Sequence, residues 1–231
     1  MKISHSSEIK NNGFDFSENL SISIQIEQII ELVAFSYLGM IDEGVTYKKS
    51  EMPRKRENYY RTKLVRLMDK FKVDKGLSHI LFDCESEETD DDCKVVGLLD
   101  IKVRFIKDNA AMEPYYRIEC KRINSTYSSY IKTGIVDFID KKYSKDNNNA
   151  AMIGFIEKGE IDRLIEKINK YLEKHHGNFT TNYLDKIELN IDSFDRFKEI
   201  YLSIHKRKKS DENIKIYHLM LDYTDIYIPS K

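Results

Sequence analysis

The residues of this 231-residue chain best suited to chemistry are Asp100, Glu119 and Lys121. Asp100 stands in the apolar run 95–103, where an acid is costly unless it is paired or bound to a cation. Glu119 and Lys121 are two residues apart in the next strand-like run, so their side chains share one face of a strand. Two adjacent strands thus offer two carboxylates and one ammonium. Mg²⁺ prefers such oxygen ligands, and a lysine beside a metal ion orients or deprotonates water and offsets charge on a phosphate.

The spacing acid-x-Lys is common by itself, and it also occurs at Glu8 and at Asp140. Neither of these follows a strand that carries an acid expected to be buried, so the context selects Glu119. The alternative is a structural ion pair, in which Asp100, Glu119 and Lys121 only balance one another on the surface of the sheet.

Asp100 followed by Glu119-Cys120-Lys121 resembles the motif of the PD-(D/E)XK nuclease superfamily. Asp100 matches the first acid, residues 119–121 match the acid-x-Lys element, and the resemblance extends over residues 57–155. Leu99 stands where the family motif has a proline that many members lack. The resemblance implies a restriction-endonuclease-like fold, which is a mixed α/β fold with a central sheet flanked by helices. It also implies a metal-dependent phosphodiesterase.

By this resemblance, the metal ion is Mg²⁺, for which Mn²⁺ can substitute. Its ligands would be the side chains of Asp100 and Glu119 and the backbone carbonyl of Cys120, with Lys121 as the catalytic lysine.

Many members of the superfamily add an acid from an N-terminal helix. Glu57 is the candidate, because it is seven residues before Leu64 and shares the apolar face of its helix. Glu31 is the rival. The alternative for Glu57 is an acid that is merely favourable near a helix N-terminus.

Hydrophobic spacing predicts the elements that position these residues. Residues 20–41 indicate a short extended start that leads into a helix. Further helices are expected over residues 54–71, 127–139 and 161–172. Strands are expected over residues 80–82, 95–105, 115–123, 151–156, 200–206 and 214–223, with 95–105 and 115–123 as one antiparallel hairpin and the last two as another. This order predicts a mixed α/β domain with helices against a central sheet.

We expect one nuclease-like domain over residues 1–231. Its expected parts are an N-terminal strand and helix extension (1–50), a core that carries the motif (54–160), and a C-terminal helix and hairpin (161–231).

The composition excludes several classes of protein. With 41% hydrophobic and 33% charged residues, the chain is too apolar for a disordered protein and too charged for a membrane protein. Its longest apolar runs are far shorter than the roughly 20 residues of a membrane span. Cys84, Cys93 and Cys120 are sparse and form no Cys-x-x-Cys pair, so we expect neither a disulfide framework nor zinc, and a cytoplasmic location.

Charge is unevenly distributed along the chain although the net charge is only −1. Residues 48–72 include ten basic and three acidic residues, which fits either a polyanion-binding surface or a solvated helix face. Residues 83–92 include seven acids and are expected to form a solvated loop. The helix after the motif carries three candidates for contact with a nucleic-acid backbone, namely Lys132, Lys141 and Lys142. The basic run 206–209 is expected to be a solvated turn, with a DNA contact as the alternative.

The expected function is that of a Mg²⁺-dependent endonuclease that hydrolyses DNA. The resemblance suggests a setting in bacterial restriction, repair or anti-phage defence. Cutting both strands would favour a homodimer. A larger partner protein would supply recognition or ATPase activity, because the chain has no P-loop motif. The alternatives are an RNA nuclease and a non-catalytic nucleic-acid-binding or scaffolding subunit.

Overall fold

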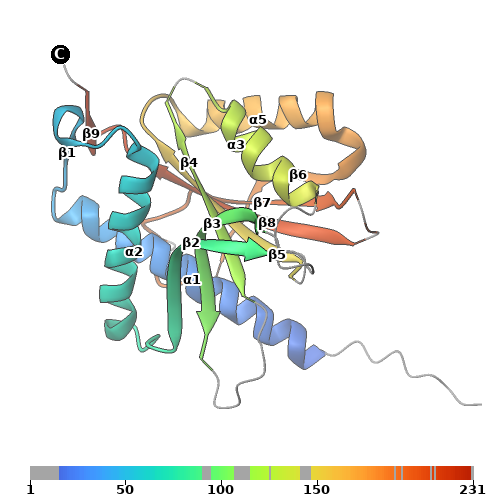
Figure 1. The fold of residues 1–231 in the computed structure, drawn as a ribbon, viewed down its shortest axis with the longest axis horizontal. Coiled ribbons are helices and arrows are strands. Elements are labelled where there is room, and N and C mark those ends of the chain that lie inside the picture. The colour runs from blue at the N-terminus through green and yellow to red at the C-terminus, as the bar shows by residue number, and fades with distance from the viewer. Residues whose placement is uncertain are drawn as a thin grey trace, which may run out of the picture.

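A seven-stranded mixed sheet forms the centre of the computed structural model (Figure 1), which describes residues 16–89, 95–106, 115–124, 126–140, 147–189, 191–193, 195–208, 210 and 212–229. The strand order is β2-β3-β4-β5-β8-β7-β6. The strands are β2 (Ile80–Thr89), β3 (Val95–Phe105), β4 (Tyr116–Ile123), β5 (Asn149–Ile156), β6 (Thr180–Lys186), β7 (Ile200–Lys206) and β8 (Asn213–Asp222). Two short strands, β1 (Tyr47–Lys48) and β9 (Tyr227–Ile228), pair separately in parallel.

Helices cover both faces of this sheet, and a hydrophobic cluster lies beneath each layer. The first cluster joins the sheet to α1 (Phe16–Asp42) and α2 (Arg56–Asp74). The second joins it to α5 (Ile161–His176) and to a helical segment formed by α3 (Ser128–Tyr130), the π-helical turn η2 (Ile131–Ile135) and α4 (Val136–Ile139). Two 3₁₀ turns, η1 (Lys49–Glu51) and η3 (Gly177–Phe179), complete the set. The predicted mixed α/β architecture is confirmed.

The middle of the sheet is parallel and its two ends are antiparallel. β4 pairs in parallel with β5, and β5 in parallel with β8. β2, β3 and β4 are antiparallel neighbours at one end, and β8, β7 and β6 at the other. Both predicted hairpins are therefore confirmed. β5 is buried on both faces along nearly all of its length, as a parallel strand between two helical layers must be.

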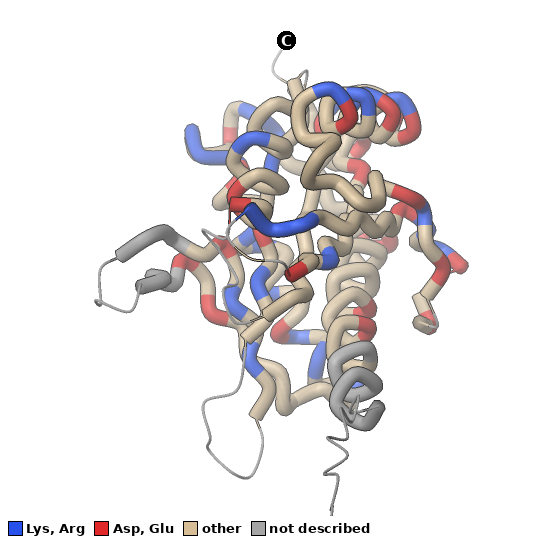
Figure 2. Tube along the Cα trace, turned by 90° about the vertical axis from the view of Figure 1, so that its right-hand side faces the viewer, with Lys and Arg blue, Asp and Glu red and all other residues tan. Residues whose placement is uncertain are grey.

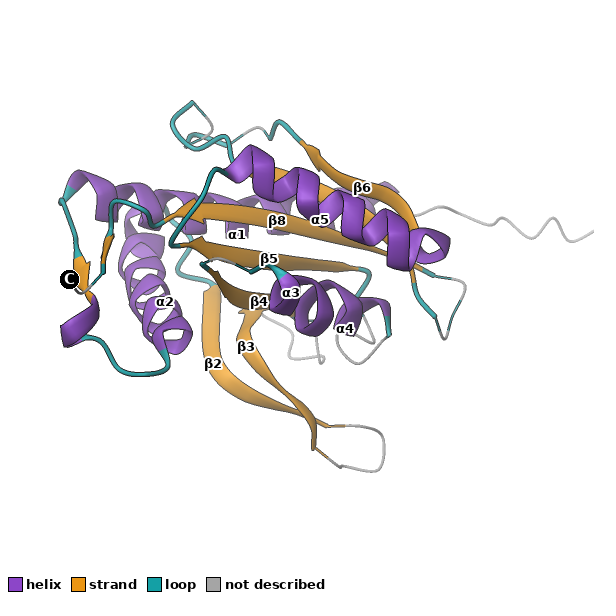
Figure 3. Ribbon diagram, turned by 90° about the horizontal axis from the view of Figure 1, so that it is seen from above, coloured by secondary structure: helices purple, strands orange, loops and turns teal. Residues whose placement is uncertain are grey.

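The ladder between β3 and β4 is short, and this creates a fork in the sheet. β3 pairs with β2 along most of its length but with β4 only at residues 101–103, which face residues 118–116. Before Ile101, β3 follows β2 away from β4 (Figure 3). Asp100 is the first residue of β3 beyond the ladder, and Glu119 is the first of β4. The sequence-predicted acids therefore meet where the two strands separate.

The extended start predicted near residue 20 is wrong, because α1 is helical from Phe16. The apolar alternation over residues 20–26 misled the prediction, since Ile22 and Ile26 are also four residues apart and fit a helix equally well. Ile24 is 47% exposed, whereas Ile26 and Ile29 are buried. Residues Ile24–Asp42 are long and apolar enough to cross a membrane by length and composition, and 61% of that window is buried inside the fold.

The acidic run 83–92 is only partly as expected. Residues 83–89 belong to β2 rather than to a loop, and the rest lies outside the described residues. β2 is an edge strand of the sheet, where charged side chains protect against pairing with other chains. The other edge strand, β6, is mostly polar and exposed and had no apolar alternation to predict it.

A buried chain of polar groups links the second helical layer to three strands. Tyr130 Oη lies 2.8 Å from His218 Nδ1, and Ser203 Oγ lies 2.7 Å from His218 Nε2. Ser203 Oγ is also 2.7 Å from His205 Nε2, and Thr180 Oγ1 is 3.2 Å from His205 Nδ1. Every ring nitrogen thus has a partner while both imidazoles stay neutral, which supports a structural role for these histidines.

We expect the free energy of unfolding to fall in acid through these two histidines. Burial lowers the pKa of His205 to about 3 and the pKa of His218 well below its ordinary value. The unfolded chain takes up both protons near pH 6.5, so stability is lost as the pH falls below that value. The loss is about 2 kcal/mol per histidine between pH 6.5 and pH 5, measurable by urea unfolding at several pH values.

The variant His205→Gln should remove about 2 kcal/mol of this pH dependence. The control His175→Gln changes an exposed histidine at the end of α5 and should leave the pH dependence intact. Equal pH profiles in wild type and His205→Gln would contradict a neutral, buried His205.

Candidate active site

Asp100 lies at the fork between β3 and β4 and is held from both sides. Its Oδ1 accepts a hydrogen bond from Arg61 of α2, and its Oδ2 accepts one from the backbone N–H of Cys120 at 2.9 Å. Lys121 Nζ is 4.0 Å from Oδ2. The acid predicted from an apolar run is therefore partly buried and faces two cations.

Glu119 and Lys121 form a buried pair beside it. Lys121 Nζ donates to Glu119 Oε1 at 2.6 Å, and both residues are at most 9% exposed. Burial, and then the charge of Asp100, raises the pKa of Glu119 to about 7. Burial alone would lower the pKa of Lys121, but the carboxylates of Glu119, Asp100 and Glu57 together raise it. Lys121 is therefore a full ammonium at neutral pH.

Glu119 keeps one free oxygen. Its Oε2 is buried and has no hydrogen-bond partner among the described residues. A buried carboxylate oxygen without a donor is costly, and such an atom calls for a cation or a water molecule.

The structure separates the two candidates for the additional acid. Glu57 Oε2 accepts a hydrogen bond from the backbone N–H of Arg122 at 2.6 Å, directly after Lys121. Burial raises the pKa of Glu57 above its ordinary value. The hydrogen bond from Arg122 and the charge of Lys121 oppose this rise, and the charge of Asp100 adds to it. Glu57 therefore lies beside the site.

Glu31 lies at a different place in the fold. Its carboxylate accepts hydrogen bonds from Lys75 at 3.1 Å and from Ser193 Oγ at 2.9 Å, so it ties α1 to the end of α2 and to the loop before β7. This set of partners explains its burial without any role at the fork.

Arg61 is the site residue that the sequence analysis did not single out. Its guanidinium is buried and bridges Asp100 to Glu85 of β2, which accepts from Arg61 Nη2 at 2.5 Å. In the sequence, Arg61 is one of ten basic residues in the stretch 48–72, which was interpreted as a polyanion-binding surface or a solvated helix face. The available signal was its spacing of four residues from Glu57, which places both on one face of α2.

A second ionic cluster fixes the start of α2 against the sheet. Glu157, just after β5, accepts two hydrogen bonds from Arg56 at 2.9 and 3.0 Å and one from Tyr60 at 2.8 Å. Arg122 lies 3.7 Å from the same carboxylate, so it belongs to this cluster. The cluster holds the first turn of α2, and hence Glu57, close to the end of β4.

The predicted nucleic-acid contacts are placed only in part. Lys132 is exposed on η2, whereas Lys141 and Lys142 lie outside the described residues. The turn 206–209 is not simply solvated. Arg207 is buried and donates hydrogen bonds to the backbone carbonyls of Asn147 at 2.8 Å and Phe138 at 3.4 Å.

The donor set at the fork fits a hard divalent cation. Asp100 and Glu119 present carboxylate oxygens, and the unpartnered Oε2 of Glu119 is available as a ligand. The thiol of Cys120 is buried in the first hydrophobic cluster, so only the backbone of this residue can serve the site. No group of three or more His, Cys, Asp or Glu side chains that could hold a metal ion occurs in the described ranges.

Comparison with known proteins found no match for this chain among protein-family models, curated proteins or solved structures. Its relation to the PD-(D/E)XK superfamily is therefore a resemblance carried by Asp100 and residues 119–121.

We expect the Arg61–Asp100 contact to stabilise the fold. Arg61→Met should lower the free energy of unfolding by about 3 kcal/mol, because the partly buried Asp100 is left with less compensation. The double variant Arg61→Met with Asp100→Asn should recover part of this loss, since it removes the charge of the partly buried Asp100 and leaves only the exposed Glu85 without Arg61. Urea unfolding of the four proteins measures the coupling.

Arg66→Met is the matched control, because Arg66 is exposed on the same helix, and its effect should stay within about 0.5 kcal/mol. Strict additivity of the two single substitutions at Arg61 and Asp100 would rule out the coupling.

Proposed function

We propose that this chain is a metal-dependent nuclease with a restriction-endonuclease-like fold. The observation that carries the proposal is the convergence of Asp100, Glu119 and Lys121 at the fork between β3 and β4, with a buried Glu119 oxygen that lacks a donor among the described residues. Glu57 and Arg61 of α2 complete the surroundings of this cluster. These are the groups that the resemblance to the PD-(D/E)XK superfamily implies, with Arg61 in addition.

Each residue has a distinct role in the proposed reaction. Asp100, Glu119 and the carbonyl of Cys120 would hold Mg²⁺, or Mn²⁺ in its place. When bound, the ion would polarise the scissile phosphate and lower the pKa of water. Lys121 has three N–H donors and gives one to Glu119, so the others are available to orient the attacking water and to offset charge on the phosphate.

Arg61 and Glu57 act through their neighbours. Arg61 donates a hydrogen bond to the carboxylate of Asp100 and so fixes its orientation. Glu57 holds the backbone just after Lys121 and so fixes the direction of β4 at the site. Both are positioning residues in this proposal.

The surface of α2 beside the site supports a polyanionic substrate. Lys55, Lys63 and Arg66 line a hollow of about 390 Å³ together with polar residues of the same helix. Lys and Arg also occur elsewhere on the described trace, in places next to Asp and Glu (Figure 2). A local basic surface of this kind attracts the phosphates of a nucleic acid. We propose DNA as the substrate.

The biological setting rests on the resemblance, and the cytoplasmic location rests on the sparse cysteines. We propose action in the cytoplasm in restriction, repair or anti-phage defence, as a homodimer where both strands are cut or with a larger partner protein that supplies recognition.

One observation favours a second function. Arg61 and Lys121 already balance Asp100 and Glu119 in the cluster described above. A non-catalytic nucleic-acid-binding subunit that keeps these charges for stability would show the same contacts. The two functions differ in whether a divalent metal and Lys121 are required for cleavage.

We expect wild-type protein to cut nucleic acid with Mg²⁺ or Mn²⁺ and not with EDTA. Lys121→Met should reduce the rate by about 100-fold or more, because the ammonium that faces the reacting phosphate is lost. The assay incubates plasmid, linear duplex, single-stranded DNA and RNA with each metal and follows the products on gels.

Lys198→Met serves as the control, because Lys198 is an exposed lysine before β7. Circular dichroism and unfolding curves establish that Lys121→Met and a second site variant, Asp100→Asn, are folded. Metal-independent cleavage, or full activity in both site variants, would exclude the proposed mechanism. Cleavage of RNA alone would change the substrate.

A further inference from the structure

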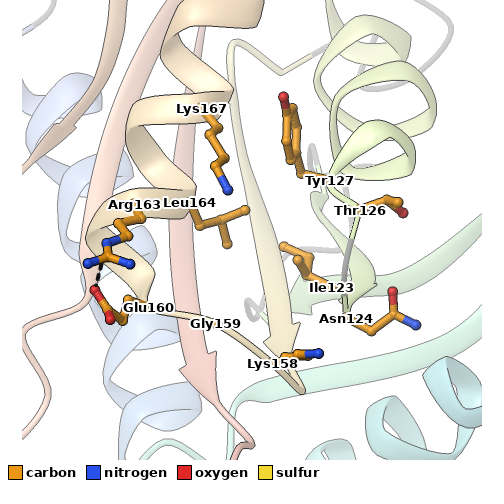
Figure 4. A pocket seen from close by; sticks show the side chains of 10 residues that line it. All are labelled: Ile123, Asn124, Thr126, Tyr127, Lys158, Gly159, Glu160, Arg163, Leu164 and Lys167. Atoms are coloured by element: carbon orange, nitrogen blue, oxygen red, sulfur yellow. Dashed lines mark ion pairs between the residues drawn. The ribbon is translucent and has the colours of Figure 1, made fainter.

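A groove of about 220 Å³ lies beyond the end of β4, between that strand and α5 (Figure 4). We call it the β4-end groove. The residues that line it include Ile123, Asn124, Tyr127, Lys158, Leu164 and Lys167. Ile123 is two residues after Lys121, so the groove begins about 7 Å further along the same strand, on the face to which Lys121 points.

The groove combines cations with one aromatic ring. Lys167 projects from α5 toward the ring of Tyr127, which stands on the opposite wall (Figure 4). Lys158 lies at the other end beside Asn124. Among the described residues, neither Lys158 nor Lys167 has an ion-pair or hydrogen-bond partner. Both ammonium groups are therefore available to an anion that enters the groove.

The remaining lining separates an apolar floor from a polar rim. Ile123 and Leu164 lie between the two walls and supply the floor. Arg163 turns away from the groove, and its Nε lies 3.0 Å from Glu160 Oε2. Glu160 is the only acid among the described residues that line the groove, and this ion pair neutralises its charge. The free charge that faces the groove is thus positive.

We propose that the β4-end groove binds one unpaired nucleotide of the nucleic-acid strand that passes through the site. This inference rests on the proposed nuclease function and names the form of its substrate. The base stacks against Tyr127, and the flanking phosphates contact Lys167 and Lys158. Stacking on an aromatic side chain, combined with cations along the backbone, is the general mode by which proteins bind single strands.

The geometry selects an unpaired strand over a duplex. A base within a duplex is stacked on both faces, so it can reach a ring inside a narrow hollow only after it leaves the stack. The groove, at about 220 Å³, is smaller than the roughly 300 Å³ of a typical small-molecule site, so it has no room for a base pair. We therefore expect preference for single strands, overhangs or frayed ends.

The test measures binding by the full chain in EDTA, where no cleavage occurs. Fluorescence anisotropy is recorded with labelled 12-nucleotide DNA, the same sequence as RNA, and the DNA duplex. Lys167→Glu should weaken binding of the single strand by tenfold or more. The slope of the logarithm of the binding constant against the logarithm of the salt concentration should become shallower by about 0.7 per lost phosphate contact. Tyr127→Leu, which keeps an apolar side chain but removes the flat ring, should weaken it by about tenfold.

The matched control is Lys174→Glu, the same charge reversal at an exposed position about two turns further along α5 and outside the groove. Duplex binding should change less than twofold in Tyr127→Leu. Equal losses in Lys167→Glu and Lys174→Glu, or equal losses for single strand and duplex, would overturn the proposal.

The outcome is separable from that of the proposed function. Groove variants that lose single-strand binding support the groove even where the wild type cuts no substrate with any metal, a result that would remove the nuclease proposal alone. Metal-dependent cleavage that needs Lys121, together with unchanged single-strand binding in both groove variants, removes the groove alone. The DNA and RNA arms identify the sugar that is bound.

Discussion

Charge neutralisation at the point where β3 leaves β4 is the constraint on which the arrangement of this molecule depends. Asp100, Glu119 and Glu57 bring three carboxyl groups into a largely buried space, and isolated buried charges cost several kcal/mol each. Arg61 and Lys121 are the compensating cations. Because α2 supplies both Arg61 and Glu57, this helix must lie against the fork, and its packing and the local electrostatics cannot vary independently.

The strands explain why such costly groups can be held at all. β4 is locked in parallel against β5, with the buried hydrophobic clusters on either side. This rigid strand presents Glu119 and Lys121 on one face and the thiol of Cys120 on the other. Positions on such a strand are more precise than positions on a loop, which is what the proposed metal site would require. Glu157, through Arg56 and Tyr60, fixes the helix that faces it.

Much of the fold and the centre of the site were predictable from local pattern. Asp100 stood out because a charge inside an apolar run needs a partner, and Glu119 because its strand placed a lysine on the same face. Arg61 did not stand out, since its partners Asp100 and Glu85 are 39 and 24 residues away and the contact depends on where α2 packs. The start of α1 was wrongly predicted as extended, because a few isoleucines at alternate positions fit both the two-residue period of a strand and the 3.6-residue period of a helix. The groove joins segments whose proximity is set only by the parallel pairing of β4 with β5.

The three residue pairs between β3 and β4 have a consequence for the energetics of local opening. β5 and β8 share eight residue pairs, so the centre of the sheet is much more strongly joined than the antiparallel pair of β2 and β3 is to β4. Elements with few cross-links open as cooperative units at a lower free energy than the global one. Amide hydrogens of β2 and β3 should therefore exchange before those of β5. Each such opening carries Asp100 away from Glu119, so the cluster of Asp100, Glu119 and Lys121 is assembled only while this strand pair is docked on β4.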